Sequence, residues 1–169
     1  PSTAVLLLSS SAGYGFLASV EAMTSRLKAG KAFVSCNAGE TPCRPSVVAG
    51  TVGSVPGPTG GLVAKPLNAA THVACASTAG RILTFEIGEL KSMNNGGRGL
   101  MLIDLEAKDS LAGAAAYTRS VRIEGIGRGG KQRDETLEIR SLNNARALRA
   151  RKGKVADLGF KPTCITRVE

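Results

Sequence analysis

The sequence contains no tryptophan and only one histidine, His72, and aromatic residues make up 4 % of its 169 residues. Val, Ile, Leu and Ala must therefore pack the interior, since hydrophobic residues as a class still account for 43 % of the chain. Scarce aromatic rings argue against a protein that stacks single-stranded bases on its side chains. With one histidine, the run from Ser9 to Ser11 has no evident general base, so we expect no enzymatic activity from this chain on its own.

The four cysteines lack the C-x-x-C spacing of a zinc site, and we expect no metal or other cofactor in this domain. A disulfide between Cys36 and Cys43 is sterically conceivable, but nothing indicates secretion, so reduced thiols in the cytoplasm are expected. The apolar run Ala4 to Leu8 has no basic segment before it and is too short to span a membrane. Together with the start at Pro1, this indicates a domain of a longer protein that does not bind a membrane.

Three copies of one pattern run along the chain: an apolar run, a glycine turn, a second apolar run, a loop with Lys or Arg beside glycine, and another apolar run. We place the copies at about residues 4–37, 71–106 and 119–169. The first and second copies are 67 residues apart, measured from Gly13 to Gly80, and the second and third are 54 apart, measured from Gly99 to Gly153. The first spacing is longer because the first copy is followed by a Gly/Pro-rich insertion at about 38–66. Such units must stack to bury a core, so we expect a single domain, residues 1–169.

The apolar runs are four to six residues long and bounded by glycine, which favours strands over helices. About four strands in each repeat of about fifty residues predict an all-β, propeller-like fold of about three blades. The stretch Leu142 to Lys154 competes as a helix, since it is rich in Ala, Leu and Arg. The corresponding stretches Met23 to Gly30 and Leu90 to Gly99 hold Ser, Thr, Asn and Gly, so the repeat favours turns at all three places.

Most of the net charge of +9 lies in the third repeat. Between Arg119 and Lys154 there are eleven Lys and Arg against four acidic residues, a net charge of +7. Because solubility alone is usually served by interspersed charges of both signs, this density favours a polyanionic partner over a merely solvated face.

The glycine-rich stretch Gly125 to Lys131 fits the spacing of both the dinucleotide-binding and the P-loop motifs. The first motif needs a helix to follow, but the polar residues after Lys131 lead into a predicted strand at Thr136 to Ile139. The second needs Ser or Thr where Gln132 stands. We therefore interpret the stretch as a hairpin turn that exposes basic residues.

Two pairs of residues outside the basic loops have structural interpretations. Glu21 and Glu89 recur at equivalent repeat positions, which indicates a turn or an ion pair within each blade. Tyr14 and Tyr117 lie in or beside strand-like runs and are predicted to be core rings.

Motifs in all three repeats carry a resemblance to one known family. They are Gly13 to Phe16 and Arg26 to Ala32 in the first repeat, Ala79 to Phe85, Glu89-Leu90 and Gly96 to Gly99 in the second, and Leu137 to Arg140 and Arg149 to Lys154 in the third. These motifs resemble the C-terminal domain of the A subunit of bacterial DNA topoisomerase IV. The resemblance covers nearly the whole chain apart from the insertion.

The resemblance implies a β-pinwheel, a propeller-like disc whose blades exchange strands and whose rim binds and bends duplex DNA. It implies a non-catalytic domain that presents the transported DNA segment during decatenation and supercoil relaxation, in the bacterial cytoplasm at the nucleoid. ATP and Mg²⁺ would be used elsewhere in the whole enzyme, and the partners would be the ATPase B subunit together with the rest of the A subunit. Family members usually have five or six blades, so three repeats imply an arc or a shortened wheel. Arg128 to Lys131 reproduces only the middle of the related gyrase box, which argues against gyrase-like wrapping.

Basic residues in glycine-containing loops are predicted to contact DNA phosphates without reading sequence. The predicted DNA-binding residues are Arg26, Lys28, Lys31, Arg98, Arg128, Lys131, Arg133, Arg146, Arg149, Arg151, Lys152 and Lys154. Because the third repeat carries most of the charge, replacing Arg149, Arg151, Lys152 and Lys154 should weaken binding more than replacing Arg26, Lys28 and Lys31. Two alternatives stay open: a module that binds an acidic patch of a protein partner, and a domain that binds structured RNA.

Overall fold

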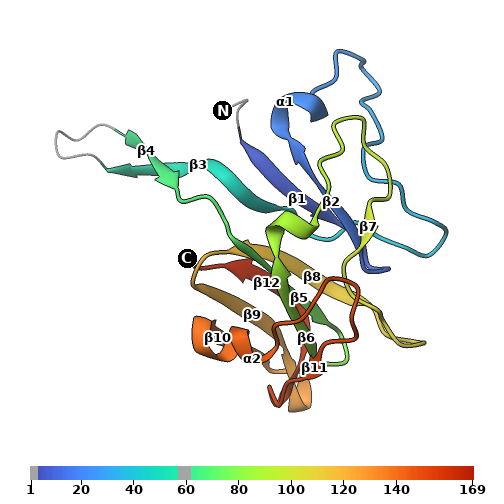
Figure 1. The fold of residues 1–169 in the computed structure, drawn as a ribbon, viewed down its shortest axis with the longest axis vertical. Helices are drawn as coiled ribbons and strands as arrows, with labels where there is room; N and C mark the ends of the chain where they lie inside the picture. The colour runs from blue at the N-terminus through green and yellow to red at the C-terminus, as the bar shows by residue number, and fades with distance from the viewer. Residues whose placement is uncertain (1–3, 57–61) are drawn as a thin grey trace.

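A computed structural model describes residues 4–56 and 62–169 and shows three antiparallel sheets (Figure 1). The first sheet has the order β4-β3-β1-β2-β7, with β1 at Val5–Ser9, β2 at Tyr14–Ser19, β3 at Ser46–Pro56, β4 at Leu62–Leu67 and β7 at Leu100–Met101. The second has the order β11-β6-β5-β8, with β5 at His72–Ser77, β6 at Arg81–Glu86, β8 at Leu111–Tyr117 and β11 at Lys154–Val155. The third has the order β10-β9-β12, with β9 at Ser120–Gly127, β10 at Gln132–Glu138 and β12 at Phe160–Arg167. Short helical turns complete the described residues: α1 at Val20–Met23, η1 at Ile87–Glu89, η2 at Arg128–Gly130 and α2 at Ile139–Asn144.

The three sheets share one plan. A hairpin (β1–β2, β5–β6 or β9–β10) pairs through its first strand with a strand later in the chain, which is β3, β8 or β12. In the first and second sheets the outer edge is completed by the next repeat, because β7 pairs with β2 and β11 pairs with β6. This exchange of strands confirms the all-β, β-pinwheel prediction, with one sheet for each of the three repeats.

A glycine directly precedes each exchanged strand and makes the exchange possible. Gly99 precedes β7 with φ +86°, and Gly153 precedes β11 with φ +74°. A Cβ on Gly99 would collide with the carbonyl oxygen of Gly15 in β2, and one on Gly153 would lie 2.6 Å from the carbonyl oxygen of Ile82 in β6. Only glycine allows both the left-handed turn and this close approach.

Apolar side chains fill the spaces between neighbouring sheets. In β5, Val73 and Cys75 join the cluster shared with the first sheet, whereas Ala74 and Ala76 join the cluster shared with the third. The second sheet is thus buried on both faces, which explains why β5 is an apolar run without polar alternation. Tyr117 is 1 % exposed, as predicted for a core ring.

The outer face of the third sheet is polar. Arg122 lies 3.4 Å from the carboxylate of Glu124 and 2.9 Å from that of Asp134. The corresponding positions of β5 hold the buried Ala74 and Ala76. A polar outer face is typical of a capping repeat, so this face suits water better than another stacked sheet.

The stretch from Leu142 to Lys154 shows how tertiary pairing overrides helix propensity. A helix is present, but it runs only over Ile139–Asn144, held by the fully buried Leu142, so the strand predicted up to Ile139 ends at Glu138. After it, Ala147 donates its N–H to the carbonyl oxygen of Thr84, and Thr84 donates to that of Ala145. The chain is therefore drawn onto the edge of β6. The predicted turn is correct beyond Asn144 and wrong before it.

The hairpin predicted at Gly125 to Lys131 is confirmed as the β9–β10 hairpin, although β10 begins at Gln132 and not at Thr136. The β3–β4 hairpin lies largely within the predicted insertion and extends away from the rest of the first sheet (Figure 1). All four cysteines are free. Within residues 4–56 and 62–169, no helix has the length and apolar composition needed to cross a membrane.

Candidate nucleic-acid interface

The strongest concentration of predicted DNA-binding residues lies in one loop at the outer edge of the second sheet. We call residues Arg146–Lys154, which lead from α2 to β11, the rim loop. Its backbone is fixed to the second repeat: Ala150 donates its N–H to Leu102 at 2.9 Å, and Arg151 accepts from the N–H of Asp104 at 3.0 Å. The loop is therefore an ordered part of the fold.

The cations of the rim loop divide into two kinds. Arg149 is half-buried and donates to the carbonyl oxygen of Met101 at 2.6 Å, and Arg146 forms an ion pair with Glu86. The other three are exposed and form no ion pair with any residue that the structure describes: Arg151, Lys152 and Lys154. The first kind holds the loop, and the second faces solvent.

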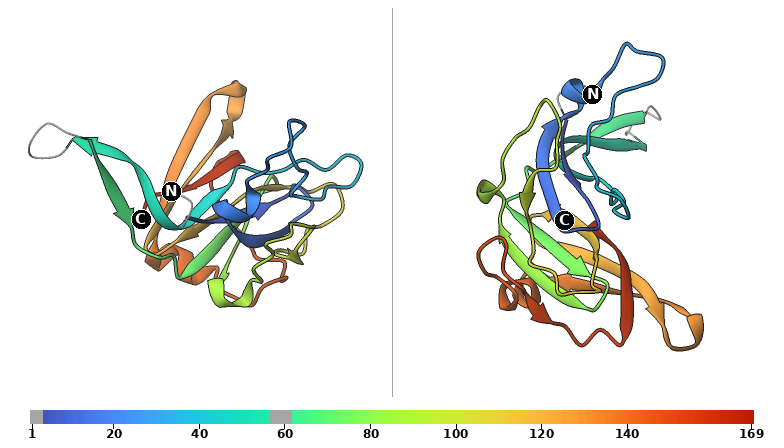
Figure 2. Two further views of the ribbon diagram at one scale, coloured as in Figure 1. Left: turned by 90° about the horizontal axis from the view of Figure 1, so that it is seen from above. Right: turned by 90° about the vertical axis from the view of Figure 1, so that its right-hand side faces the viewer.

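A second group of exposed cations lies at the end of the β9–β10 hairpin. Arg128, Lys131 and Arg133 are exposed and have no carboxylate partner among the described residues. Gly129 and Gly130 both have positive φ, which lets the chain turn tightly between the strands. The hairpin projects beyond the rest of the sheets, with this hairpin tip (Gly127–Arg133) at its end (Figure 2).

The rim loop and the third sheet lie side by side. Lys154 and Val155 of β11 share a shallow groove of about 190 Å³ with Leu137 of β10 and Asn144 of α2. The third repeat thus places exposed cations near both ends of β10: the rim loop lies beside Leu137 at the C-terminal end of this strand, and the hairpin tip leads into its N-terminal end.

Arg98 is held differently from the residue at the same repeat position, Lys152. Its guanidinium pairs with Glu40 at 2.9 Å and lies 4.2 Å from the ring centroid of Tyr14. A cation over an aromatic ring and beside a carboxylate is largely satisfied within the protein. Tyr14 is half-buried beneath this guanidinium and is not a fully buried core ring.

The predicted cations of the first repeat lie in the loop after α1. Arg26, Lys28 and Lys31 are exposed, and the ammonium of Lys31 lies 5.4 Å from the ring of Phe33. This loop belongs to the end of the molecule formed by the first sheet, whereas α2, β10 and β11 lie at the opposite end (Figure 1).

Sequence reasoning missed the carboxylates that engage these cations and one further group of basic residues. From the repeat, Glu89 is predicted to serve a turn or an ion pair within its blade. Glu89 does lie in the turn η1. Its carboxylate, however, accepts the backbone N–H of Arg149 from the next repeat. Arg44 and Lys161 line a groove of about 680 Å³ beside the start of β8, the end of β9 and the first half of β12, with no acidic lining residue. No local pattern signals either feature, since both depend on strand order.

Among the residues that the structure describes, no three His, Cys, Asp or Glu side chains are grouped as metal ligands.

Stacked antiparallel sheets that exchange edge strands define a β-pinwheel domain. The family model described as the DNA gyrase C-terminal domain, beta-propeller, matches residues 71–117. Over 150 residues the chain is 33 % identical to the A subunit of DNA topoisomerase 4 from Neisseria gonorrhoeae, and the match covers 88 % of this chain. The chain belongs to the family of C-terminal domains found in the A subunits of topoisomerase IV and gyrase.

Solved structures of such domains have the same fold. The C-terminal domain of E. coli ParC aligns over 98 % of this chain and 60 % of its own, with a TM-score of 0.73 and 21 % identity. A C-terminal domain of DNA topoisomerase IV aligns over 97 % of this chain and 46 % of its own, with a TM-score of 0.68 and 13 % identity. A DNA gyrase A C-terminal domain aligns over 96 % and 47 %, with a TM-score of 0.62 and 17 % identity. The chain spans 17 % of the length of the Neisseria relative.

Proposed function

We propose that this chain is a DNA-holding domain from the A subunit of a type IIA topoisomerase, which binds and bends duplex DNA and presents the segment to be transported. One observation carries the proposal: six exposed cations of the rim loop and the hairpin tip form no ion pair with any described residue. They are Arg128, Lys131, Arg133, Arg151, Lys152 and Lys154. Arg and Lys in this arrangement suit phosphates spaced along a duplex.

Sequence-independent binding follows from where these cations lie. They project from a loop and a hairpin tip. Among the described residues the longest α-helix is α2, with six residues, so no long recognition helix is present there to enter a major groove. Contacts to phosphates fix the position of a protein on DNA but carry no direct sequence information. The few aromatic rings offer little for stacking on unpaired bases, so a duplex is the better ligand.

In this proposal the chemistry belongs to other parts of the enzyme. Strand cleavage, Mg²⁺ binding and ATP hydrolysis would be carried out in the bacterial cytoplasm by the ATPase B subunit together with the rest of the A subunit. The isolated chain should therefore neither cleave nor relax DNA.

We expect binding to weaken steeply with salt. If the six cations each neutralise a phosphate, the slope of log affinity against log salt should be about −5, and affinity should fall about a thousandfold between about 50 and 200 mM. Titrating two unrelated duplexes by fluorescence anisotropy at several salt concentrations measures both the slope and the sequence preference. A flat response, or a strong preference for one duplex, would contradict the proposal.

A competition experiment and a capture experiment separate the two alternatives. Structured RNA that displaces bound duplex at equal concentration would favour an RNA-binding domain. Capture of an acidic protein that survives nuclease treatment, without measurable duplex affinity, would favour the protein-binding module.

A further inference from the structure

The rim loop places like charges close together, and its conformation must be held against their repulsion. Arg151, Lys152 and Lys154 fall within four residues, and the loop contains two positive-φ residues, Ala150 at +64° and Gly153 at +74°. A loop that is free in solution must be ordered when it binds, and this ordering subtracts from affinity. Groups that order it beforehand therefore strengthen binding.

Glu89 holds the middle of the rim loop. Its carboxylate oxygen Oε1 accepts the backbone N–H of Arg149 at 3.0 Å, and the side chain is only partly exposed. Hydrogen bonds to an ionised acceptor are stronger than those between neutral groups. Because the Arg149 guanidinium also donates to Met101, residue 149 is tied to the second repeat by both its backbone and its side chain.

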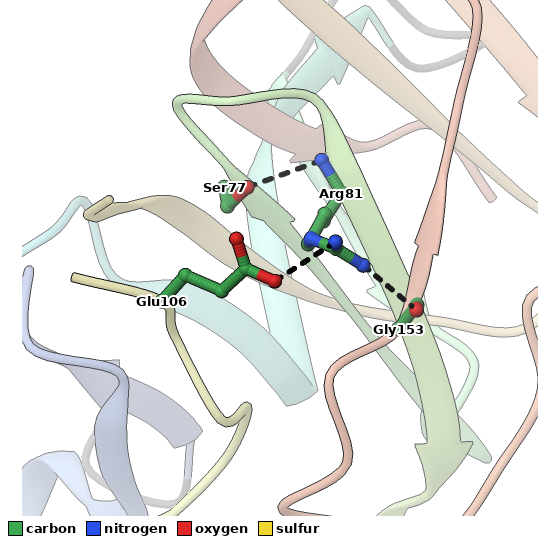
Figure 3. A network of polar contacts seen from close by, with 4 residues as sticks. All are labelled: Ser77, Arg81, Glu106 and Gly153. Carbon is green, nitrogen blue, oxygen red and sulfur yellow. Dashed lines mark hydrogen bonds and ion pairs between the residues drawn. The ribbon is translucent and has the colours of Figure 1, made fainter. Parts of the chain in front are cut away.

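Arg81 lies at the other end of the loop (Figure 3). Its guanidinium is 3.0 Å from Glu106 and 3.5 Å from the carbonyl oxygen of Gly153, while its backbone N–H donates to the hydroxyl of Ser77. A hydrogen bond of 3.5 Å is weak, so Arg81 contributes less than Glu89.

We infer that Glu89 is a positioning residue for DNA binding: an acidic side chain that strengthens the binding of a polyanion because it fixes the backbone of the rim loop. This inference rests on the proposed function. Charge alone predicts the opposite, since removing an acid beside a cluster of cations raises the positive potential that DNA meets.

Two substitutions that remove the same charge separate the two effects. Glu89→Gln keeps an oxygen that can accept the Arg149 N–H, whereas Glu89→Ala does not. We expect E89Q to bind a duplex at least as tightly as the unmodified chain and E89A to bind about three- to tenfold more weakly. The salt slope should be unchanged in both, because the phosphate-contacting cations remain. If E89A binds as tightly as E89Q, the inference is overturned.

Glu89→Asp gives an independent test should E89A fold poorly. It keeps the charge but shortens the side chain by one methylene, which withdraws the acceptor from Arg149. Positioning predicts weaker binding with an unchanged slope, and unaltered binding would overturn the inference. Thermal melts check that each variant is folded. Failure of the unmodified chain to bind any duplex would instead refute the proposed function, so the two failures are distinguishable.

Discussion

Replacing Arg151, Lys152 and Lys154 together with alanine should weaken duplex binding on the order of a hundredfold, taking about 1 kcal/mol for each lost charge-assisted contact. The slope of log affinity against log salt should shrink by about 3, one unit for each phosphate contact. Stability should change little, because exposed loop substitutions usually alter the free energy of unfolding by less than about 0.5 kcal/mol each. Anisotropy titrations at several salt concentrations measure both effects.

The matched control removes three exposed cations from the first repeat: Arg26, Lys28 and Lys31. It changes net charge by the same amount, so any general effect of charge is common to both variants. Its loop lies beside the first sheet, away from the hairpin tip, and we expect a clearly smaller loss of affinity. Equal losses would show that DNA lies on another surface. Arg149 is left out of the first variant because its guanidinium donates a hydrogen bond to the carbonyl oxygen of Met101 and so helps to hold the rim loop.

Gly99→Ala should destabilise the fold by about 2–4 kcal/mol, through left-handed backbone strain and overpacking. Its new Cβ would collide with the carbonyl oxygen of Gly15, where β7 joins β2. The clash would push apart the first two repeats at their exchanged strand. Urea denaturation followed by circular dichroism measures the free energy of unfolding.

Gly30 offers a matched control, because it occupies the same repeat position and has φ +74°. A Cβ there would meet no atom within 4 Å. Gly30→Ala should therefore cost only the backbone term, about 1–2 kcal/mol. If both variants lose the same stability, close packing at Gly99 is not what holds the exchanged strand.

The repeat in the sequence predicted the fold well because it reflects the strand exchange itself. The glycine that recurs at Gly99 and Gly153 is required where an exchanged strand meets its neighbour, so its spacing marks the blades. The extent of α2 could not be predicted, since the helix ends where Thr84, more than fifty residues earlier, takes up the backbone of Ala145 and Ala147.

The candidate site was only partly predictable for a similar reason. Charge density identified the third repeat, and the glycine-rich turn identified the hairpin tip. Sequence could not separate the exposed Lys152 from Arg98, which pairs with Glu40, fifty-eight residues away. Ion pairs between repeats depend on which loop crosses which sheet, and that order exists only in the folded chain.

Amide chemical shifts of the chain during titration with a short duplex test the central claim most directly, because they report which residues meet DNA. The account predicts that the largest changes fall in the rim loop and the hairpin tip, at residues 146–154 and 127–133, with smaller changes at residues 26–31. Changes centred on the groove beside Arg44 and Lys161, or confined to the first repeat, would contradict it.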